Sequence, residues 1–292
     1  MIRSEKAFLP EIDAYIDYFK KKKIEIYDSK TLDMYNINDY DVIWEFKGFG
    51  GVNTKERLLI HDYASLSTGK LPKLKNMLKA MANPKPDIRI FLNNDVMKEF
   101  NFYDNIDYCY RDMGINDNFL NFKSSKKEYE FVYIGSISKE RQMDKFIGKI
   151  NKQKIGRVCF IGDVDFEIYK QYKFNKDFTF VGKINHNDIP DVASRSIYGI
   201  NYIPNKYPYN LQTSTKLLEY LALGLNVVTT NYKWINDFEI RNSCKFYKIN
   251  DFEINLQELE KFDFKNDIDM EDFLWDNIID KSGIYKKIIS KF

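Results

Sequence analysis

The chain has 292 residues, and its 45 lysines and arginines against 43 acidic residues leave a formal charge of +2, which gives no field that demands a nucleic-acid partner. Its hydrophobic fraction of 44% is enough for a packed core and excludes wholesale disorder. No stretch approaches the roughly 20 apolar residues of a membrane-spanning helix, and the N-terminus lacks the apolar region of a secretory signal. Three widely spaced cysteines favour free buried thiols in a reducing compartment, so we expect a cytoplasmic protein.

The first part of the chain, residues 1–122, predicts an α/β lobe with a loose pattern. Apolar residues at helical spacing predict helices over residues 12–22 and 73–81. Short apolar runs predict strands over residues 24–26, 41–44, 58–60 and 88–91. A polar, charged stretch at residues 121–127 then separates this lobe from a more regular one.

The second part, residues 128–269, alternates short apolar strands with amphipathic helices. Three apolar runs each end in a glycine, at Gly135, Gly162 and Gly182. Helices are expected over residues 139–152, 188–195 and 213–223, and further strands over 198–203 and 226–230. This alternation indicates βαβ units on a buried parallel sheet, with a ligand site at its carboxyl edge. From about residue 270 the chain is amphipathic and predicts one or two more helices, so we expect two Rossmann-like α/β lobes with a cleft between them.

The segment from Gln212 to Gly224 carries the most chemical information. Thr213 or Ser214 can cap the start of a helix and Gly224 can end it. A helix N-terminus attracts anions, and Lys216 adds a full charge in the first turn. Thr215, Lys216 and Glu219 share one face, so a diphosphate at the helix start leaves Glu219 about 5 Å away, within reach of a ribose. The alternative is a plain amphipathic helix with a solvated lysine–glutamate pair.

This segment also carries a resemblance. Leu218–Gly224 together with Val227–Thr230 resembles the L-E-A-M-A-x-G-x-P-V-V-[AS]-T signature of the GT4-type (glycosyl transferases group 1) family. Other matching pieces follow in the family's order: Leu59–Asp62, Met113–Phe119, Phe131–Gly135 with Arg141, Phe180–Gly182, and Trp275 with Tyr285. The resemblance implies a GT-B fold whose C-terminal helix crosses back to the first lobe, and a retaining sugar transfer from a nucleotide diphosphate.

The resemblance also implies roles for individual residues. Arg141, Lys216 and the helix start at Ser214 and Thr215 would neutralise the departing diphosphate, beside Gly135 and Ser136, and Glu219 would hold the ribose. Gly182 and Lys183 would lie against the base, His61 would hydrogen-bond the donor sugar, and Asp62 would contact the acceptor. His186 reads as a loop or helix-cap residue, and we assign it no role.

Two departures from the family pattern concern the donor. The family's first glutamate, eight positions before Glu219, is Leu211 here, so Asn210 or Gln212 would take its place. The arginine that often follows the strand-end glycine is Ser136, which leaves Arg141 as the expected phosphate ligand.

We predict no metal site and no cofactor beyond the nucleotide sugar. Asp163–Asp165 matches the D-x-D triplet that holds a metal–nucleotide complex in GT-A enzymes. The same triplet recurs at Asp39–Asp41 and Asp267–Asp269, so a solvated loop is the simpler interpretation. Positive side chains would replace the metal.

The expected activity is transfer of a sugar to a saccharide or lipid-linked saccharide, in surface polysaccharide synthesis, without a nucleic-acid partner. The lysine run in Phe19–Lys23 adds the expectation of peripheral contact with the inner face of a membrane. Three alternatives stay open: a sugar-nucleotide epimerase on the same fold, a non-catalytic subunit of a larger transferase, and, more distantly, a GT-A enzyme.

Overall fold

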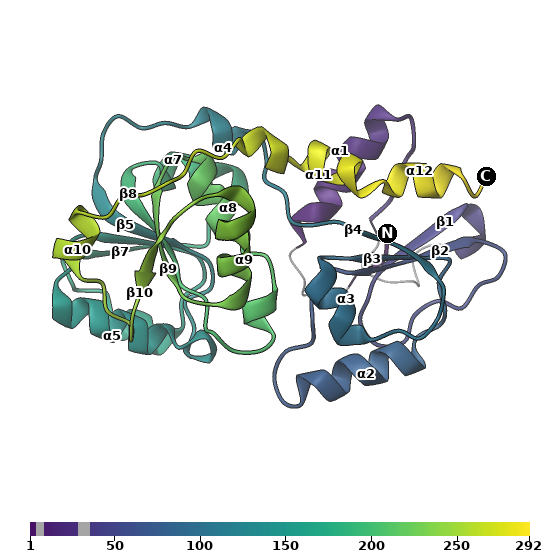
Figure 1. The fold of residues 1–292 in the computed structure, drawn as a ribbon, viewed down its shortest axis with the longest axis horizontal. Coiled ribbons are helices and arrows are strands. Elements are labelled where there is room, and N and C mark those ends of the chain that lie inside the picture. The colour runs from purple at the N-terminus through teal and green to yellow at the C-terminus, as the bar shows by residue number, and fades with distance from the viewer. Residues whose placement is uncertain (4–8, 29–35) are drawn as a thin grey trace. The chain divides into compact units, whose positions relative to one another are not determined.

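The computed structural model describes residues 1–3, 9–28 and 36–292 (Figure 1). The chain forms two compact units. The first contains Met1–Gly114, Leu211–Thr213 and Asp272–Phe292, and the second contains Ile115–Asn210 and Ser214–Glu271.

The first unit is built on a parallel sheet in the order β1-β2-β3-β4. Its strands are β1 (Val42–Phe46), β2 (Leu58–Tyr63), β3 (Ile88–Phe91) and β4 (Asp107–Tyr110). Its helices are α1 (Pro10–Lys21), the short η2 (Ile37–Asp39), α2 (Pro72–Ala82) and α3 (Asn94–Phe100). Strands β2 and β3 are almost wholly buried, as strands of a covered parallel sheet are, and each carries a short apolar stretch: Leu58–Ile60 in β2, and Ile88, Ile90 and Phe91 in β3.

The C-terminal tail completes the core of this first unit. It forms η6 (Met270–Phe273), α11 (Trp275–Ser282) and α12 (Ile284–Ile289). Trp275 and Ile279 are buried in one cluster with Tyr15 and Phe19 of α1. The Tyr18 hydroxyl also donates to Asp280 at 2.8 Å. The predicted return of the last helices to the first lobe is therefore confirmed.

The second unit is built on a six-stranded parallel sheet in the order β10-β9-β8-β5-β6-β7. Its strands are β5 (Tyr129–Ile134), β6 (Val158–Ile161), β7 (Phe178–Gly182), β8 (Ser196–Asn201), β9 (Asn226–Thr230) and β10 (Tyr247–Ile249). The helices are α4 (Asn118–Asn121), η3 (Lys139–Arg141), α5 (Met143–Gln153), α6 (Phe166–Tyr172), η4 (His186–Asp188), α7 (Ile189–Ala193), η5 (Tyr209–Leu211), α8 (Thr215–Ala222), α9 (Lys233–Asn242) and α10 (Leu256–Glu260). Counted along the chain, this is the doubly wound order 3-2-1-4-5-6, which reverses between β5 and β8.

Both units are thus Rossmann-like, as the sequence predicts, with one strand wrong and two missed. Residues 24–26 form no strand. Ile24 and Ile26 instead pack against the core as irregular chain, and the Ile24 N–H bonds the carbonyl of Phe19 at 3.0 Å. The edge strands β4 and β10 were not predicted; β4 exposes three of its four residues, so it lacks a continuous apolar run.

Candidate functional site

The sheet of the second unit opens where its strand order reverses. Strands β5 and β8 stay paired up to Val132 and Gly199. Beyond that point the Tyr220 hydroxyl lies between them, accepting from the Ile134 N–H at 2.8 Å and donating to the Ile200 carbonyl at 3.2 Å. A Cβ on Gly199 would lie 2.3 Å from the Tyr220 ring, so the glycine is what admits the ring. The carboxyl ends of the strands beside this point are where folds of this topology bind ligands.

Glycines line this edge on the side of β5, β6 and β7. Gly135, Gly162 and Gly182 end these strands with φ of +130°, +139° and +80°. Backbone hydrogen bonds join the ends of these neighbouring strands. The Gly135 N–H donates to the Ile161 carbonyl at 2.8 Å, and the Gly162 N–H donates to the Gly182 carbonyl at 2.9 Å. A Cβ on Gly162 would lie 2.2 Å from the Gly135 carbonyl oxygen. The edge is therefore made of backbone alone, which lets a flat or charged ligand approach it closely.

Lys216, at the start of α8, reaches this edge. Its side chain is 9% exposed, and its ammonium lies 3.3 Å from the Tyr133 hydroxyl and 4.3 Å from the centre of that ring. A Cβ on Gly135 would lie 3.6 Å from the same Nζ. Burial, and then the charge of Arg141, lower the pKa of Lys216 to about 7, against a partial opposing effect of Glu219. Within the described part of the chain Lys216 forms no ion pair, and the charge of Glu219 only partly offsets the fall of its pKa.

The start of α8 has no side-chain cap. Ser214 occupies the N-cap position without capping the helix. Its hydroxyl instead donates to Asn201 Oδ1 at 2.7 Å, and Asn201 in turn donates to Thr229 and Tyr232. The N–H groups of the first turn, including that of Thr215, therefore keep no side-chain cap and can bind an anion.

Glu219 lies one turn further along α8 and is buried. Its Oε1 lies 2.7 Å from Nε2 of His186, and no hydrogen bond to Oε2 is found in the described part of the chain. The His186 ring lies 5.2 Å from the ring of Phe119, centre to centre. His186, to which the sequence assigned no role, is thus the partner that orients this carboxylate.

Arg141 approaches the same edge from η3. Its guanidinium lies 5.8 Å from the ring of Tyr209, and the Tyr209 hydroxyl donates to Glu140 at 3.3 Å. Burial raises the pKa of Tyr133 to about 12, although Arg141 opposes the shift. Ser136 accepts a hydrogen bond from Tyr133 at its carbonyl, at 3.2 Å. These contacts place Ser136 and Arg141 in one cluster with Lys216.

The remaining donor residues are less closely placed. Lys183 is exposed beyond Gly182. Asn210 donates to Asn205 at 3.4 Å within its own loop. Gln212 belongs to the short stretch Leu211–Thr213 that is part of the first unit, where Asn93 donates to the Leu211 carbonyl at 3.1 Å.

His61 lies in β2 of the first unit and has no exposed surface. Its Nε2 is 3.2 Å from Glu45 Oε2, and Lys47 lies 3.1 Å from the same oxygen. Burial lowers the pKa of His61, and the hydrogen bond that the imidazole donates to Glu45 only partly offsets this shift. The imidazole is therefore enclosed in the first unit and paired with Glu45.

Asp62 is also buried and forms part of an internal ion cluster. Its carboxylate lies 3.2 Å from Arg111 and accepts from the Tyr15 hydroxyl at 3.3 Å. Arg111 also lies 3.4 Å from Glu11. Burial raises the pKa of both carboxyls against the opposing effect of Arg111. Asp62 thus reaches a buried guanidinium and not solvent, and its predicted contact with an acceptor stays a prediction.

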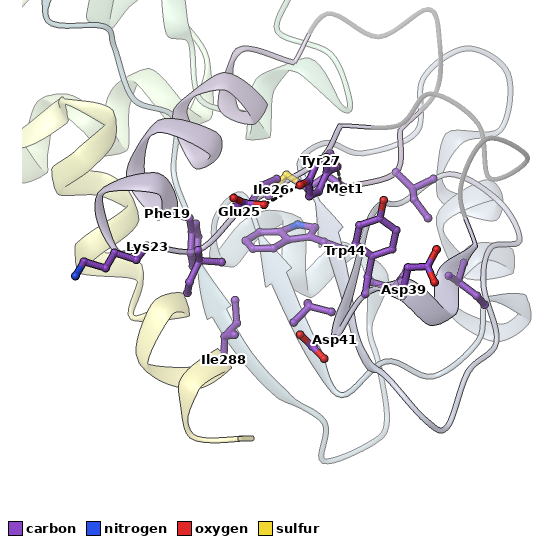
Figure 2. Close-up of a pocket in the computed structure, with 16 residues that line it drawn as sticks. Met1, Phe19, Lys23, Glu25, Ile26, Tyr27, Asp39, Asp41, Trp44 and Ile288 are labelled. Carbon is purple, nitrogen blue, oxygen red and sulfur yellow. Dashed lines mark hydrogen bonds between the residues drawn. The ribbon is translucent and has the colours of Figure 1, made fainter.

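A pocket of about 670 Å³ lies elsewhere in the first unit, at the start of β1 (Figure 2). The indole of Trp44 stands in its middle, and Met1 donates from its amino group to the Tyr27 carbonyl beside it. None of the predicted site residues lines this pocket. Its position at the amino end of the strand separates it from the carboxyl edges that carry His61 and Asp62.

Across residues 1–3, 9–28 and 36–292, no group of three or more His, Cys, Asp and Glu side chains is placed to hold a metal ion. Asp165 instead accepts a hydrogen bond from the Lys139 N–H at 2.8 Å. Within the same ranges, every helix is too short or too polar to span a bilayer.

The second unit therefore brings together Gly135, Ser136, Arg141, Lys216 and the start of α8, with Glu219 a turn away. The sequence missed Tyr133, His186 and Tyr220, which complete this cluster. Only Tyr133 left a local signal, a hydroxyl inside an otherwise apolar strand; the other two contacts join distant parts of the chain.

No family model matches the sequence, and no curated protein does. Solved structures do match the fold. Sucrose-phosphate synthase from Thermosynechococcus elongatus superimposes with a TM-score of 0.62 at 13% identity, over 81% of this chain and 69% of that one. WaaG, a glycosyltransferase involved in lipopolysaccharide biosynthesis, superimposes with a TM-score of 0.56 at 10% identity, over 97% of this chain and 90% of WaaG. AviGT4, a glycosyltransferase involved in avilamycin A biosynthesis, superimposes with a TM-score of 0.55 at 11% identity, over 86% of this chain and 75% of AviGT4. The chain therefore has the GT-B glycosyltransferase fold, which confirms the fold predicted from the sequence.

Proposed function

We propose that this protein transfers a sugar from a nucleotide diphosphate to a hydroxyl of a saccharide or lipid-linked saccharide, in surface polysaccharide synthesis. The observation that carries the proposal is Lys216, a buried lysine against the glycine edge of a doubly wound sheet, which forms no ion pair in the described part of the chain. The fold shared with glycosyltransferases of low identity supports the same class of reaction.

The diphosphate would lie at the start of α8. Three observations support this placement: the helix start has no side-chain cap, the Lys216 ammonium lies near Gly135, and the charge of Arg141 acts on Lys216. As the bond between the sugar and the diphosphate breaks, negative charge grows on the leaving oxygen. Fixed positive groups stabilise that charge without reorganising, so they lower the barrier and serve in place of a metal ion.

Glu219 would hold the ribose of the nucleotide. A carboxylate can accept hydrogen bonds from two sugar hydroxyls. His186 occupies only Oε1 of Glu219, and the ring of Phe119 steadies the imidazole. His186 would thus fix the carboxylate before the nucleotide arrives. Gly182 and Lys183 would lie against the base.

Retention of configuration at the anomeric carbon rests on the sequence resemblance alone and is part of the proposal. The roles of His61 with the donor sugar and of Asp62 with the acceptor remain predictions. Because both side chains are buried in this structure, the proposal depends on the second unit and not on them.

Calorimetric titration of the full chain with UDP, GDP, dTDP, ADP and CMP, with EDTA present, tests the donor site. We expect one nucleotide to bind selectively, and Glu219→Ala to weaken that binding about tenfold, since hydrogen bonds to a charged group contribute about 1.5–3 kcal/mol. Glu260→Ala, which removes an exposed carboxylate at the end of α10, is the control and should leave affinity unchanged. Absence of binding by all five would refute the proposal.

The nucleotide that binds then names the donors to test for reaction. Conversion of the donor without an acceptor, followed by NMR, would identify an epimerase instead. Nucleotide binding without turnover on any acceptor would favour a non-catalytic subunit, and strict dependence on Mn²⁺ would contradict the metal-free site.

A further inference from the structure

Helix α2 of the first unit presents its apolar side outward. Leu71, just before the helix, and Met81, near its end, are 70% and 76% exposed. Three more large apolar side chains on the helix are exposed, namely Leu74, Met77 and Leu78. At 100° per residue, the four helical members fall within one stripe about 100° wide.

The opposite side of α2 faces the protein and is polar or small. Asn76 is the only buried residue of the helix, and its side chain accepts from the Ser67 N–H at 2.9 Å. Asn83 closes the helix and binds Gly48 and Gly50 of the neighbouring loop. The usual burial pattern is therefore reversed, since a helix of a water-soluble domain normally turns its apolar stripe to the core. In Figure 1, α2 lies at the margin of its unit.

The chain segment that contains this stripe carries charge of one sign. Between Tyr63 and Pro86 there are five lysines and no acidic residue; the lysines are Lys70, Lys73, Lys75, Lys79 and Lys85. On the helical wheel Lys73 and Lys75 stand on either side of the stripe. An apolar face flanked by lysines is the arrangement of helices that lie in the plane of a membrane surface.

We propose that α2 docks this protein onto an anionic lipid bilayer, with the stripe from Leu71 to Met81 inserted among the acyl chains and the flanking lysines against the headgroups. A second copy of the chain fits the surface less well, because a two-fold interface would bring two sets of like charges together. The proposal concerns the first unit and does not rest on the proposed sugar transfer.

The lysine run in Phe19–Lys23 offers no comparable surface. Lys21 forms an ion pair with Asp276, and Lys22 lies 5.5 Å from the centres of the Tyr18 and Tyr285 rings. The apolar residues of α1 are buried, so this run lacks an exposed stripe.

Co-sedimentation of the full chain with vesicles tests the proposal. We expect binding to vesicles of phosphatidylcholine and phosphatidylglycerol, and little to phosphatidylcholine alone. Lys70→Gln with Lys75→Gln should weaken binding roughly fivefold per lysine, the equivalent of about 1 kcal/mol each. Met77→Glu with Met81→Glu should abolish it. Lys152→Gln with Lys176→Gln, two exposed lysines of the second unit, is the matched control and should leave binding unchanged.

Several results would overturn the proposal: no binding to anionic vesicles, equal binding by all variants, or a concentration-dependent dimer that the Met77→Glu, Met81→Glu variant dissolves. Circular dichroism and nucleotide affinity of each variant serve as the folding readouts. Because the substitutions at residues 70–81 lie in the first unit, unchanged nucleotide binding with lost vesicle binding separates this proposal from that of sugar transfer.

Discussion

Replacing Lys216 by methionine should weaken nucleotide binding while stabilising the nucleotide-free protein. A fall of the lysine pKa from 10.5 to about 7 means that the folded site disfavours the ammonium by roughly 5 kcal/mol relative to water. Methionine has a similar length and no charge, so it removes this cost. Methionine also loses the contact of the ammonium with Tyr133, which reduces the benefit. We therefore expect the free energy of unfolding to rise by about 1–3 kcal/mol at about pH 6, which raises the Tm by several degrees.

The sign of the pH dependence follows from the direction of the shift. Below about pH 7 the lysine is charged in both the folded and the unfolded chain, and the full cost is present. Between about pH 7 and 10.5 the unfolded chain binds the proton and the folded chain does not, so the stability of the wild type rises with pH. The advantage of Lys216→Met should therefore be largest at or below pH 7 and narrow above it.

Lys216→Met should weaken nucleotide binding, although it stabilises the nucleotide-free protein. A hydrogen bond from a charged group to phosphate contributes about 1.5–3 kcal/mol, so Lys216→Met should weaken nucleoside diphosphate binding roughly 10- to 150-fold. A bound phosphate also raises the pKa of Lys216. The wild type should thus take up a proton on binding near pH 7 and lose affinity from about pH 7 to 9, whereas the variant should show neither effect.

Thermal unfolding and calorimetry in two buffers of different ionisation enthalpy measure these quantities. Lys152→Met, at an exposed position of α5, is the control and should change neither. A destabilised Lys216→Met variant that binds nucleotide as the wild type does would refute the reasoning, because Lys216 would then be a structural residue.

Three further substitutions test the framework of the two units. Gly162→Ala places a Cβ 2.2 Å from a backbone carbonyl oxygen at φ +139°, so we expect thermal unfolding to show a loss of stability of at least about 2 kcal/mol. The control Gly48→Ala meets open space and should change the stability by no more than about 0.5 kcal/mol. Tyr220→Phe leaves a buried N–H without its partner and should cost about 1–3 kcal/mol in denaturant unfolding; no loss would mean that the strands close without the hydroxyl. Asp62→Asn leaves Arg111 with less compensating charge and should cost about 3 kcal/mol, with nucleotide affinity unchanged; a loss of affinity with intact stability would contradict its assignment to the ion cluster.

The fold could be predicted because its signals are local. Strands of a parallel sheet are covered on both faces, so β5 and β6 read as apolar runs. Gly135, Gly162 and Gly182 follow or end the strands at positive φ, and Gly162 also leaves no room for a Cβ. Lys216 and Glu219 could be placed on one helix face for the same reason, since helical spacing fixes it.

What the sequence could not predict depends on contacts between distant residues. The pair His186 and Glu219 joins positions 33 apart, and Tyr220 bonds a strand 86 positions earlier. Helical periodicity predicts α2, but periodicity says nothing about which side faces the protein. In α2 the hydrogen bonds of Asn76 and Asn83 fix the side that faces the protein, and the apolar stripe therefore faces outward.

A crystal structure of the protein with the nucleoside diphosphate that binds it is the most direct test of the central claim. We predict both phosphates at the N-terminus of α8, within hydrogen-bond distance of the Lys216 ammonium, and a ribose hydroxyl on Glu219. A nucleotide bound elsewhere, for example in the pocket around Trp44, with the first turn of α8 empty, would contradict the account.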